Sequence, residues 1–225
     1  LLLPEGWTFR QVRQALESHP ELEPDTAGLS DAEILARIGA SEKHLEGLFF
    51  PDTYLFDKRS GALAVLKRAY GAMQAQLERT WAERDPATPL ASPYEALVLA
   101  SIIEKETGRP EDRGLVASVF SNRLRIGMRL QTDPSVIYGL GPDFDGRLRR
   151  SHLDTDHPWN TYTRAGLPPT PIAIPGEAAL RAAVQPEKSE FLYFVARGDG
   201  SSEFSTTLAD HNRAVNKFIR NGGGR

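Results

Sequence analysis

Cysteine is absent from this chain of 225 residues. Without thiols the protein has no disulfide scaffold, zinc ribbon, iron–sulfur cluster or cysteine nucleophile. Long hydrophobic runs are absent too, since the longest, from Ala96 to Ile103, contains Ser101 and is far shorter than the roughly 20 residues that span a bilayer. Positive charge is not in excess, because 27 basic residues face 30 acidic ones. This balance argues against a dedicated nucleic-acid-binding protein.

What is present is the composition of an ordinary globular protein, with 40% apolar and 25% charged residues. A chain of this length can bury a core without help from disulfides. No signal peptide is visible, and the chain opens on Leu1 rather than on methionine. We therefore expect it to be part of a longer protein, in which any membrane anchor would lie upstream.

Helix signals dominate the first part of the chain. Ser30 and Glu33 form a capping box before an apolar run that Gly39 ends, and Thr8 with Gln11 repeats this pattern. Caps and periodicity predict a helix from about Phe9 and further helices over residues 31–38, 61–83, 93–107, 111–125, 134–138, 178–184 and 208–219.

Strands are few in this pattern. Residues 1–3 and 128–131 have the character of short strands, and residues 191–196 and 203–205 flank a Gly-Asp-Gly turn as the two arms of a hairpin. The proline-rich segment 154–171 is typical of a loop. Because helices and strands are partly segregated, the predicted class is α+β, with a helix-rich domain, short strands and a β-hairpin.

Two glutamates end the most apolar predicted helix. A helix that is apolar nearly all round is buried, so its C-terminal carboxyl groups leave the core where desolvation raises a carboxyl pKa and favours an acid. Glu106 has Arg109 three residues on, which would hold it ionised if the helix continues that far. Glu104 has no basic partner at helical spacing and is the stronger candidate for a neutral acid. The alternative, that residues 104–106 simply face solvent, stays open at this point.

A second carboxyl group follows in residues 129–134. Asp133 stands before Pro134, and capping a helix is the default role of such a residue. The functional alternative places Asp133 beside Glu104 as an acid/base pair of the kind that glycosidases use.

Other polar segments are less decisive. Residues 152–157 contain two histidines and two aspartates, but their spacing matches no strong zinc or calcium signature, which favours a polar loop. His211 is compatible with a proton donor, a residue that orients a ligand, or a core histidine. Asn160 and Tyr162, with the prolines after them, are typical of a rigid loop that lines a carbohydrate site or of a purely structural loop.

Taken together, the motifs make the chain similar to a known family. The matching blocks are PEGWT (4–8), EGLFFPDTY (46–54), ASIIEKET (100–107), VFSNRL (119–124), LQTDP (130–134), NTY (160–162), GLPP (166–169), PG (175–176), LYFV (192–195) and HN (211–212). In this order they resemble the endolytic murein transglycosylases of the YceG-like family over essentially the whole chain. The chain departs from a frequent family pattern at 157–159, where Ser-Pro-Tyr is common, and at Ile174, often asparagine.

The resemblance implies a lytic transglycosylase that cuts peptidoglycan strands between N-acetylmuramic acid (MurNAc) and N-acetylglucosamine and leaves 1,6-anhydro ends. It places the catalytic glutamate on Glu104, without a metal or cofactor. It also implies the remainder of a small LysM-like α/β subdomain over residues 1–56 and a catalytic domain over residues 57–225. Residues for sugar binding and for orienting Glu104 are then expected to be Asn122, Gln131, Asp133, Asn160 and Tyr162.

Family members carry a single N-terminal membrane helix, so the resemblance implies an anchored protein with its catalytic domain outside the cytoplasm. Glycan strands are the expected partner, together with synthases of cell-wall elongation or division. Because the muramic acid C6 hydroxyl is the nucleophile, one carboxyl group suffices, and Glu104→Gln is expected to abolish the anhydro product. Two rivals stay open: a hydrolase that uses Glu104 with Asp133, and a glycan-binding module without catalysis.

Overall fold

The computed structural model describes residues 1–220 of the chain, in which helices predominate over a few short strands, as the α+β class predicts. The helices are α1 (Phe9–Glu17), α2 (Asp31–Ile38), α3 (Ala62–Ala82), α4 (Pro93–Glu106), α5 (Arg113–Arg125), α6 (Asp133–Leu140), α7 (Arg150–Asp154), α8 (Glu177–Val184) and α9 (Leu208–Val215). The short turns are the 3₁₀ helices η1 (Pro110–Asp112) and η2 (Gly141–Asp143) and the π-helical η3 (Asn216–Arg220). The strands are β1 (Leu22–Glu23), β2 (Ser60–Gly61), β3 (Tyr193–Ala196) and β4 (Ser202–Ser205).

The predicted caps of α2 are present. The backbone N–H of Ser30 donates to the Glu33 carboxylate at 2.8 Å, and the Ser30 hydroxyl accepts from the Glu33 N–H at 3.3 Å. Gly39 ends the helix in the left-handed region, at a φ of 78° that a residue without a Cβ adopts without strain. Local side-chain chemistry therefore sets both ends of this helix.

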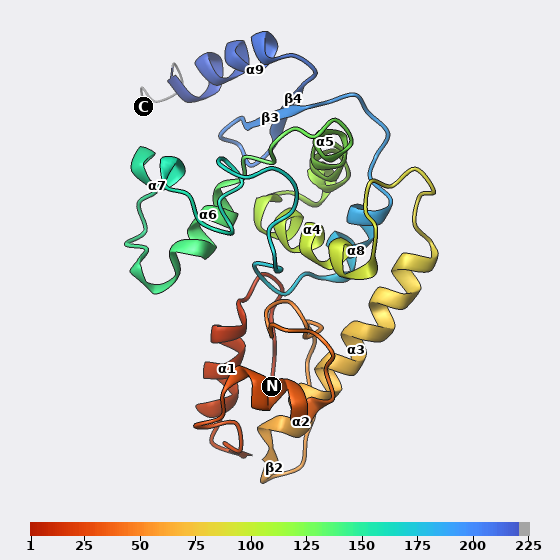
Figure 1. Ribbon diagram of the computed structural model, residues 1–225, viewed down its shortest axis with the longest axis vertical. Helices are drawn as coiled ribbons and strands as arrows, with labels where there is room; N and C mark the ends of the chain where they lie inside the picture. Colours follow the sequence, from red (N-terminus) through yellow and green to blue (C-terminus); the bar gives the residue numbers. More distant parts are fainter. Residues whose placement is uncertain (221–225) are drawn as a thin grey trace.

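Two lobes make up the molecule (Figure 1), a lower one with α1, α2 and the β1–β2 pair, and an upper one with α4 to α9. Helix α3 runs between them and packs on α2, α4 and α8. Strand β1 pairs in parallel with β2 across residue 56 of the sequence, with Leu22 opposite Ser60. The expected boundary at residue 56 and the LysM-like assignment stay predictions.

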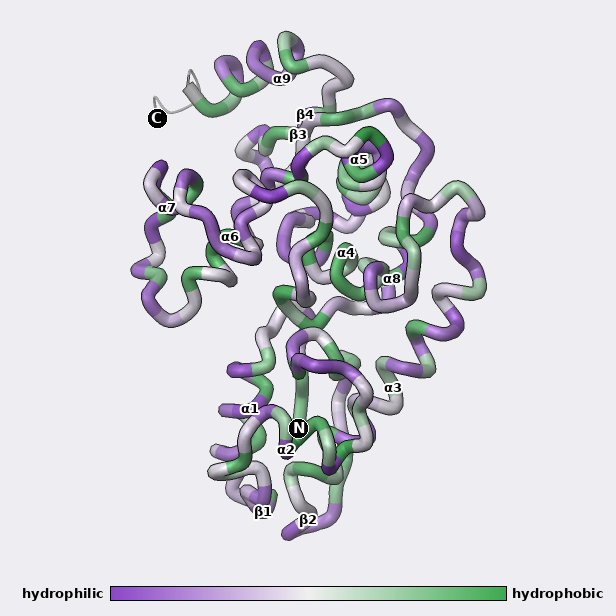
Figure 2. The backbone as a smooth tube through the Cα atoms, viewed as in Figure 1, coloured by the Kyte–Doolittle hydropathy of each residue, from purple (hydrophilic) through white to green (hydrophobic). Residues whose placement is uncertain are grey.

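Helix α4 forms the centre of the upper lobe. Its residues 96–103 are all buried, which explains why the sequence is apolar on nearly every side of this helix. Helices α3, α5, α6 and α8 pack around it, and Figure 2 shows hydrophobic residues along much of α4 and α8. In residues 1–220 no helix combines the length and apolar character needed to cross a membrane.

The strand predicted over residues 128–131 does not form. The segment has no regular secondary structure, and its amides bond to a helix end and a loop: Met128 N donates to Arg123 O at 2.8 Å and Gln131 N to Thr161 O at 3.1 Å. Its apolar pattern reflects the full burial of Leu130 and not the pairing of strands.

Helix α6 starts one residue earlier than predicted. Thr132 holds the N-cap position with extended backbone, and Asp133 is the first helical residue rather than the cap. An acidic side chain in the first turn is stabilised by the positive end of the helix dipole.

The predicted hairpin is confirmed, with β3 and β4 antiparallel and Tyr193 opposite Ser205. Helix α9 packs on both strands, and its backbone continues as the π-helical turn η3. The expected first strand is reduced to one antiparallel bridge between Leu2 and Thr53. The hairpin and α9 together close the upper lobe on one side (Figure 1).

Candidate active site

A cleft of about 310 Å³ lies between α4, α5, the start of α6 and the hairpin with α9. It brings together side chains that are up to 105 positions apart in the sequence, Glu106 and His211 at the extremes. The lining consists of Glu106, Phe120, Arg123, Leu130, Gln131, Asp133, Tyr162, Tyr193, Phe194, Leu208 and His211. Aromatic rings with carboxyl, amide and guanidinium groups are suited to binding a sugar, whose faces are apolar and whose edges are polar.

The two glutamates of α4 face different surroundings. Residues two apart on a helix are turned by about 200°, so the side chains of Glu104 and Glu106 leave α4 in nearly opposite directions. Glu106 lines the cleft, whereas the Glu104 carboxylate accepts a hydrogen bond from Gly176 N at 3.0 Å, at the start of α8. Only one of the two carboxyl groups therefore meets the other polar residues of the cleft.

Glu106 is held in place from α6. Its Oε1 accepts a hydrogen bond from the Thr132 hydroxyl at 2.6 Å. Burial raises the pKa of Glu106 above its ordinary value, and the charge of Asp133 raises it further, while the Thr132 hydroxyl and the Arg123 guanidinium lower it. The net direction is upward, so the protonated form of Glu106 is favoured more than in a solvent-exposed glutamate.

Asp133 and Tyr162 form a pair on the same wall. The Tyr162 hydroxyl donates to Asp133 Oδ1 at 2.5 Å. Burial and this carboxylate raise the pKa of Tyr162, so the phenol keeps its proton. Asp133 thus has a hydrogen-bond donor and the N-terminus of α6 to stabilise its negative charge.

The backbone between the cleft and α6 is strained at one residue. Gln131 has a φ of 49°, a region that few residues other than glycine adopt. Hydrogen bonds on both sides hold it there: Gln131 N donates to Thr161 O at 3.1 Å, and Thr132 N donates to Thr161 Oγ1 at 3.0 Å. This conformation brings Gln131 to the cleft wall and Thr132 to Glu106.

Glu104 lies at the junction of the two lobes. The junction is fixed by Gly6 N, which donates to Ile174 O at 2.8 Å, and by Ile174 N, which donates to Trp7 O at 2.7 Å. Burial raises the pKa of Glu104, the Gly176 N–H lowers it, and the charge of Glu5 raises it. Both glutamates of α4 thus have raised pKa values, and they differ in that Glu106 lines the cleft and Glu104 does not.

The neighbour argument made from the sequence does not hold for Glu106. Helix α4 ends at Glu106, so Arg109 lies beyond it and donates to the backbone of Asp199 in the hairpin turn. The basic neighbour of Glu106 is Arg123, which comes from α5 and is 17 positions further along the chain. Helical spacing could not reveal a contact between two different helices.

Two of the expected sugar-binding residues have structural contacts instead. The Asn122 side-chain amide donates to Ser189 O and Phe191 O, both at 2.9 Å, and so fastens α5 to the segment before β3. Asn160 is fully buried, and its amide donates to Thr155 O at 2.7 Å. Of the predicted set, Gln131, Asp133 and Tyr162 line the cleft, while Asn122 and Asn160 support its walls.

Sequence reasoning missed Arg123, Tyr193 and the place of His211. Arg123 is only 7% exposed; its Nε donates to Leu192 O at 2.7 Å and its Nη1 to Leu130 O at 2.6 Å. Its guanidinium lies over the Tyr193 ring, 5.3 Å from the centroid. Arg123 lies in the last turn of α5 between Asn122 and Leu124, where arginines are usually exposed, so nothing in the sequence signalled its burial.

The acidic groups of residues 152–157 are paired with arginines. Asp154 pairs with Arg150 at 3.2 Å, and Asp156 pairs with Arg164 at 2.9 Å. In the part of the chain that the structure describes, no group of three or more histidine, cysteine, aspartate or glutamate side chains is placed to hold a metal ion. The predicted polar loop is helical over its first half, because residues 152–154 end α7, and residues 155–157 are irregular.

The curated proteins that this chain resembles are named endolytic murein transglycosylases. An endolytic murein transglycosylase of Bacillus subtilis is 39% identical over 178 residues, which cover 79% of this chain and 49% of the relative. One of Streptococcus pneumoniae is 27% identical over 251 residues, which cover 97% of this chain and 44% of the relative. The chain thus spans about half the length of these curated relatives.

The fold comparison agrees. A crystal structure of a yceG-like protein from Listeria monocytogenes matches with a TM-score of 0.79 and 34% identity, over 95% of this chain and 75% of that one. The model of the YceG-like family matches residues 1–217, which is nearly the whole chain. The chain belongs to the YceG-like family.

Proposed function

We propose that this chain is an endolytic lytic transglycosylase that cleaves the bond between MurNAc and N-acetylglucosamine in peptidoglycan strands, with Glu106 as the catalytic acid. The names of the relatives support the substrate and the reaction class. The observation that carries the residue assignment is the position of Glu106, a partly buried carboxyl group that lines the cleft beside Asp133 and Tyr162.

The proposed reaction needs one carboxyl group in two roles. Neutral Glu106 gives its proton to the glycosidic oxygen as the bond to C1 of MurNAc breaks and positive charge develops on the sugar ring. The resulting carboxylate takes the proton from the C6 hydroxyl of the same MurNAc, whose oxygen bonds to C1. The products are a free 4-hydroxyl on N-acetylglucosamine and a 1,6-anhydro end, and Glu106 is again neutral.

The surroundings of Glu106 suit both halves of this cycle. Burial and the nearby Asp133 carboxylate favour the protonated acid before cleavage. The Thr132 hydroxyl and the Arg123 guanidinium favour the carboxylate that forms after cleavage. Each protonation state of Glu106 thus has neighbours that stabilise it, as an acid that later acts as a base requires.

Glu104 is the rival acid that the family resemblance had selected. Its pKa is raised as well, and like Glu106 it is partly buried. Its carboxylate accepts from Gly176 at the lobe junction, whereas the expected sugar-binding residues Gln131 and Tyr162 share the cleft of Glu106. This geometry favours Glu106, and the matched pair of variants described next separates the two.

The test is product analysis with Glu106→Gln and Glu104→Gln. Each purified chain is incubated with purified glycan strands, and new ends are identified by mass spectrometry. The proposal predicts anhydro ends with the natural chain and with Glu104→Gln, and none with Glu106→Gln. Loss of product in Glu104→Gln alone, with its melting temperature unchanged, would instead assign the acid to Glu104.

The same experiment tests the two other functions. A hydrolase that uses an acid with Asp133 as base would leave a reducing MurNAc end, heavier than the anhydro end by one water. A glycan-binding module would release no fragments at any enzyme concentration. Either result would overturn the proposed reaction.

A further inference from the structure

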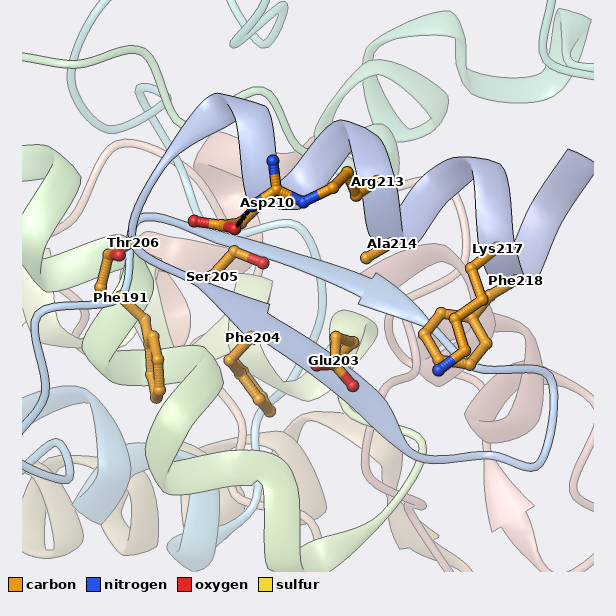
Figure 3. A pocket seen from close by; sticks show the side chains of 10 residues that line it. All are labelled: Phe191, Glu203, Phe204, Ser205, Thr206, Asp210, Arg213, Ala214, Lys217 and Phe218. Carbon is orange, nitrogen blue, oxygen red and sulfur yellow. Dashed lines mark hydrogen bonds and ion pairs between the residues drawn. The ribbon is translucent and has the colours of Figure 1, made fainter.

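Helix α9 places His211 on a part of the cleft wall that the proposed mechanism leaves without a role. The hydroxyl of Thr207 accepts from Asp210 N at 3.1 Å and so caps the helix. Leu208 and His211 then line the cleft. On the other side, Arg213 of α9 and Lys217 of η3 are among the residues that line a separate hollow of about 380 Å³ against β4 (Figure 3). The two faces of this helix therefore serve different surfaces.

The imidazole of His211 is fixed by stacking. Its ring lies nearly parallel to that of Tyr193, with the ring centroids 5.2 Å apart and the planes at 25°. The Arg123 guanidinium contacts the same tyrosine, 5.3 Å from the ring centroid. Three cleft residues from α5, β3 and α9 thus form one continuous wall, which we call the stacked wall.

The proton of His211 can be placed by burial. Its Nδ1 is buried, with no hydrogen-bond partner among the described residues. An N–H group without an acceptor is rarely buried, so the proton belongs on Nε2, the nitrogen that is left to face the cleft. Burial and the charge of Arg123 lower the pKa of His211, so the ring is neutral near pH 7. His211 therefore presents an N–H donor to the cleft.

Arg123 supplies a second donor to the same wall. Its Nε and Nη1 bond to the backbone oxygens of Leu192 and Leu130. Both bonds hold the guanidinium still, and Nη2 is the remaining nitrogen of this cleft-lining side chain. The stacked wall thus offers donors, whereas Glu106 and Asp133 bring carboxyl oxygens to the cleft.

We propose that the stacked wall binds an acyl oxygen of the glycan strand, through His211 Nε2 and Arg123 Nη2, and so positions the sugar for cleavage. The inference rests on the proposed function, because it assumes that the cleft holds this substrate. A glycan strand carries acyl oxygens of two kinds: the acetamido carbonyl of every sugar, and the lactyl carbonyl or carboxylate of MurNAc alone. Donors on a rigid wall recognise this chemistry in either group.

Three substitutions at His211 test the position of the donor. His211→Phe keeps a ring on Tyr193 and removes the N–H. His211→Gln restores a donor near the place of Nε2, and His211→Asn restores one near the place of Nδ1. Lys217→Gln, in η3 and facing the separate hollow, is the control. We expect about three- to tenfold weaker binding for Phe and Asn, near-natural binding for Gln and for the control, and unchanged melting temperatures.

Binding is measured separately from cleavage. Glycan strands are titrated into Glu106→Gln and into Glu106→Gln combined with each His211 variant, so that no strand is cut. Persistent cleavage by Glu106→Gln would count against the proposed function alone. Equal binding by the combined His211→Phe variant, or no recovery with His211→Gln, would overturn the role of His211. In active chains, His211→Phe should raise KM and leave the pH profile unchanged, because His211 is not the acid.

De-N-acetylated strands identify the acyl group. If the wall binds the acetamido carbonyl, the natural chain binds these strands weakly and His211→Phe causes no further loss. If it binds the lactyl group, the penalty of His211→Phe persists on them. Either pattern supports the proposal, and a penalty on neither strand type contradicts it.

Discussion

Glu106 and Glu104 leave the C-terminal end of α4 on two sides with different surroundings, and the local sequence does not predict this difference. On one side Glu106 opens into a cleft whose walls come from α5, α6 and the hairpin with α9. On the other side Glu104 holds the start of α8, where the lower lobe meets the loop that carries Ile174. Both carboxyl groups have pKa values raised chiefly by burial.

Under the proposed assignment of Glu106 as the acid, a raised carboxyl pKa is not by itself the sign of a catalytic residue. Burial raises the pKa of both carboxyl groups, whether or not a ligand can reach them. What separates the two sides is access for a ligand and the presence of further polar groups around the carboxyl group.

The largest effect is expected from Glu106→Gln. Gln keeps the volume and accepts from Thr132, but it has no proton to give to the glycosidic oxygen. We expect strand cleavage to fall by roughly 10²–10⁴-fold, which is the usual contribution of a general acid. The rate of anhydro-end formation measures this, with the melting temperature as control. A loss below tenfold would remove Glu106 from the reaction.

A second prediction concerns the lobe junction and its pH dependence. Glu46 is 7% exposed, and its carboxylate accepts from Phe9 N at 2.8 Å. Burial raises its pKa to about 7 from an ordinary value of 4.5. The folded state therefore holds this proton more tightly than the unfolded chain, so the stabilisation present below pH 4.5 is lost as the pH rises through 7.

The expected loss at Glu46 is about 3 kcal/mol between pH 4.5 and pH 8. Glu46→Gln still offers an oxygen to Phe9 and does not titrate, so its free energy of unfolding should fall less over this range. Denaturant unfolding of both chains at several pH values measures the difference. Parallel curves for the two chains would mean that Glu46 ionises in the folded state as it does in the unfolded chain.

Sequence patterns predicted the features that depend on neighbouring residues. The Ser30–Glu33 box and the hairpin turn are local, and both are present. Residues 128–131 failed as a strand because alternation reports burial and not the presence of a pairing partner. Propensity cannot supply that second strand.

The candidate site shows the same limit more sharply. Asp133 and Tyr162 were selected from separate segments, and the structure brings them within 2.5 Å. Asn160 was also expected to bind sugar, but it is buried, and its side chain bonds to the backbone of its own loop. Choosing between the glutamates required the direction in which α4 turns each side chain relative to packed neighbours. That direction is set by tertiary contacts far apart in sequence, such as Thr132 on Glu106.

A third prediction concerns the effect of Asp133 on the pKa of Glu106. The charge of Asp133 raises the pKa of Glu106, so Asp133→Asn lowers it. Because the acid must be protonated, the rate falls as pH rises through this pKa, and the alkaline limb of kcat/KM should move to lower pH. At the natural optimum we expect a loss of roughly three- to tenfold.

Tyr162→Phe is the matched control for Asp133→Asn. It removes the hydrogen bond to Asp133 and leaves the charge in place, so the alkaline limb should stay near its natural position. If Asp133→Asn changes KM alone and leaves the pH profile fixed, Asp133 binds sugar and does not act on Glu106. The two outcomes thus separate a role of Asp133 in sugar binding from a role in proton transfer by Glu106.

The smallest effect is expected at Glu104, to which the proposal gives a structural role. Glu104→Gln keeps an oxygen for Gly176 N, so the free energy of unfolding should change by less than about 0.5 kcal/mol. Glu104→Ala leaves that N–H without its acceptor and should cost about 1–2 kcal/mol. Denaturant unfolding measures both.

Activity then decides what the junction does for the cleft. If α4 is held mainly by its buried residues 96–103, both Glu104 variants should cleave strands within about threefold of the natural rate, because Glu106 keeps its own contacts. A rate that falls together with stability in Glu104→Ala, but not in Glu104→Gln, would mean that the Gly176 contact orients the cleft. The two sides of α4 would then be coupled, and the junction would belong to the working site even though its carboxyl group gives no proton.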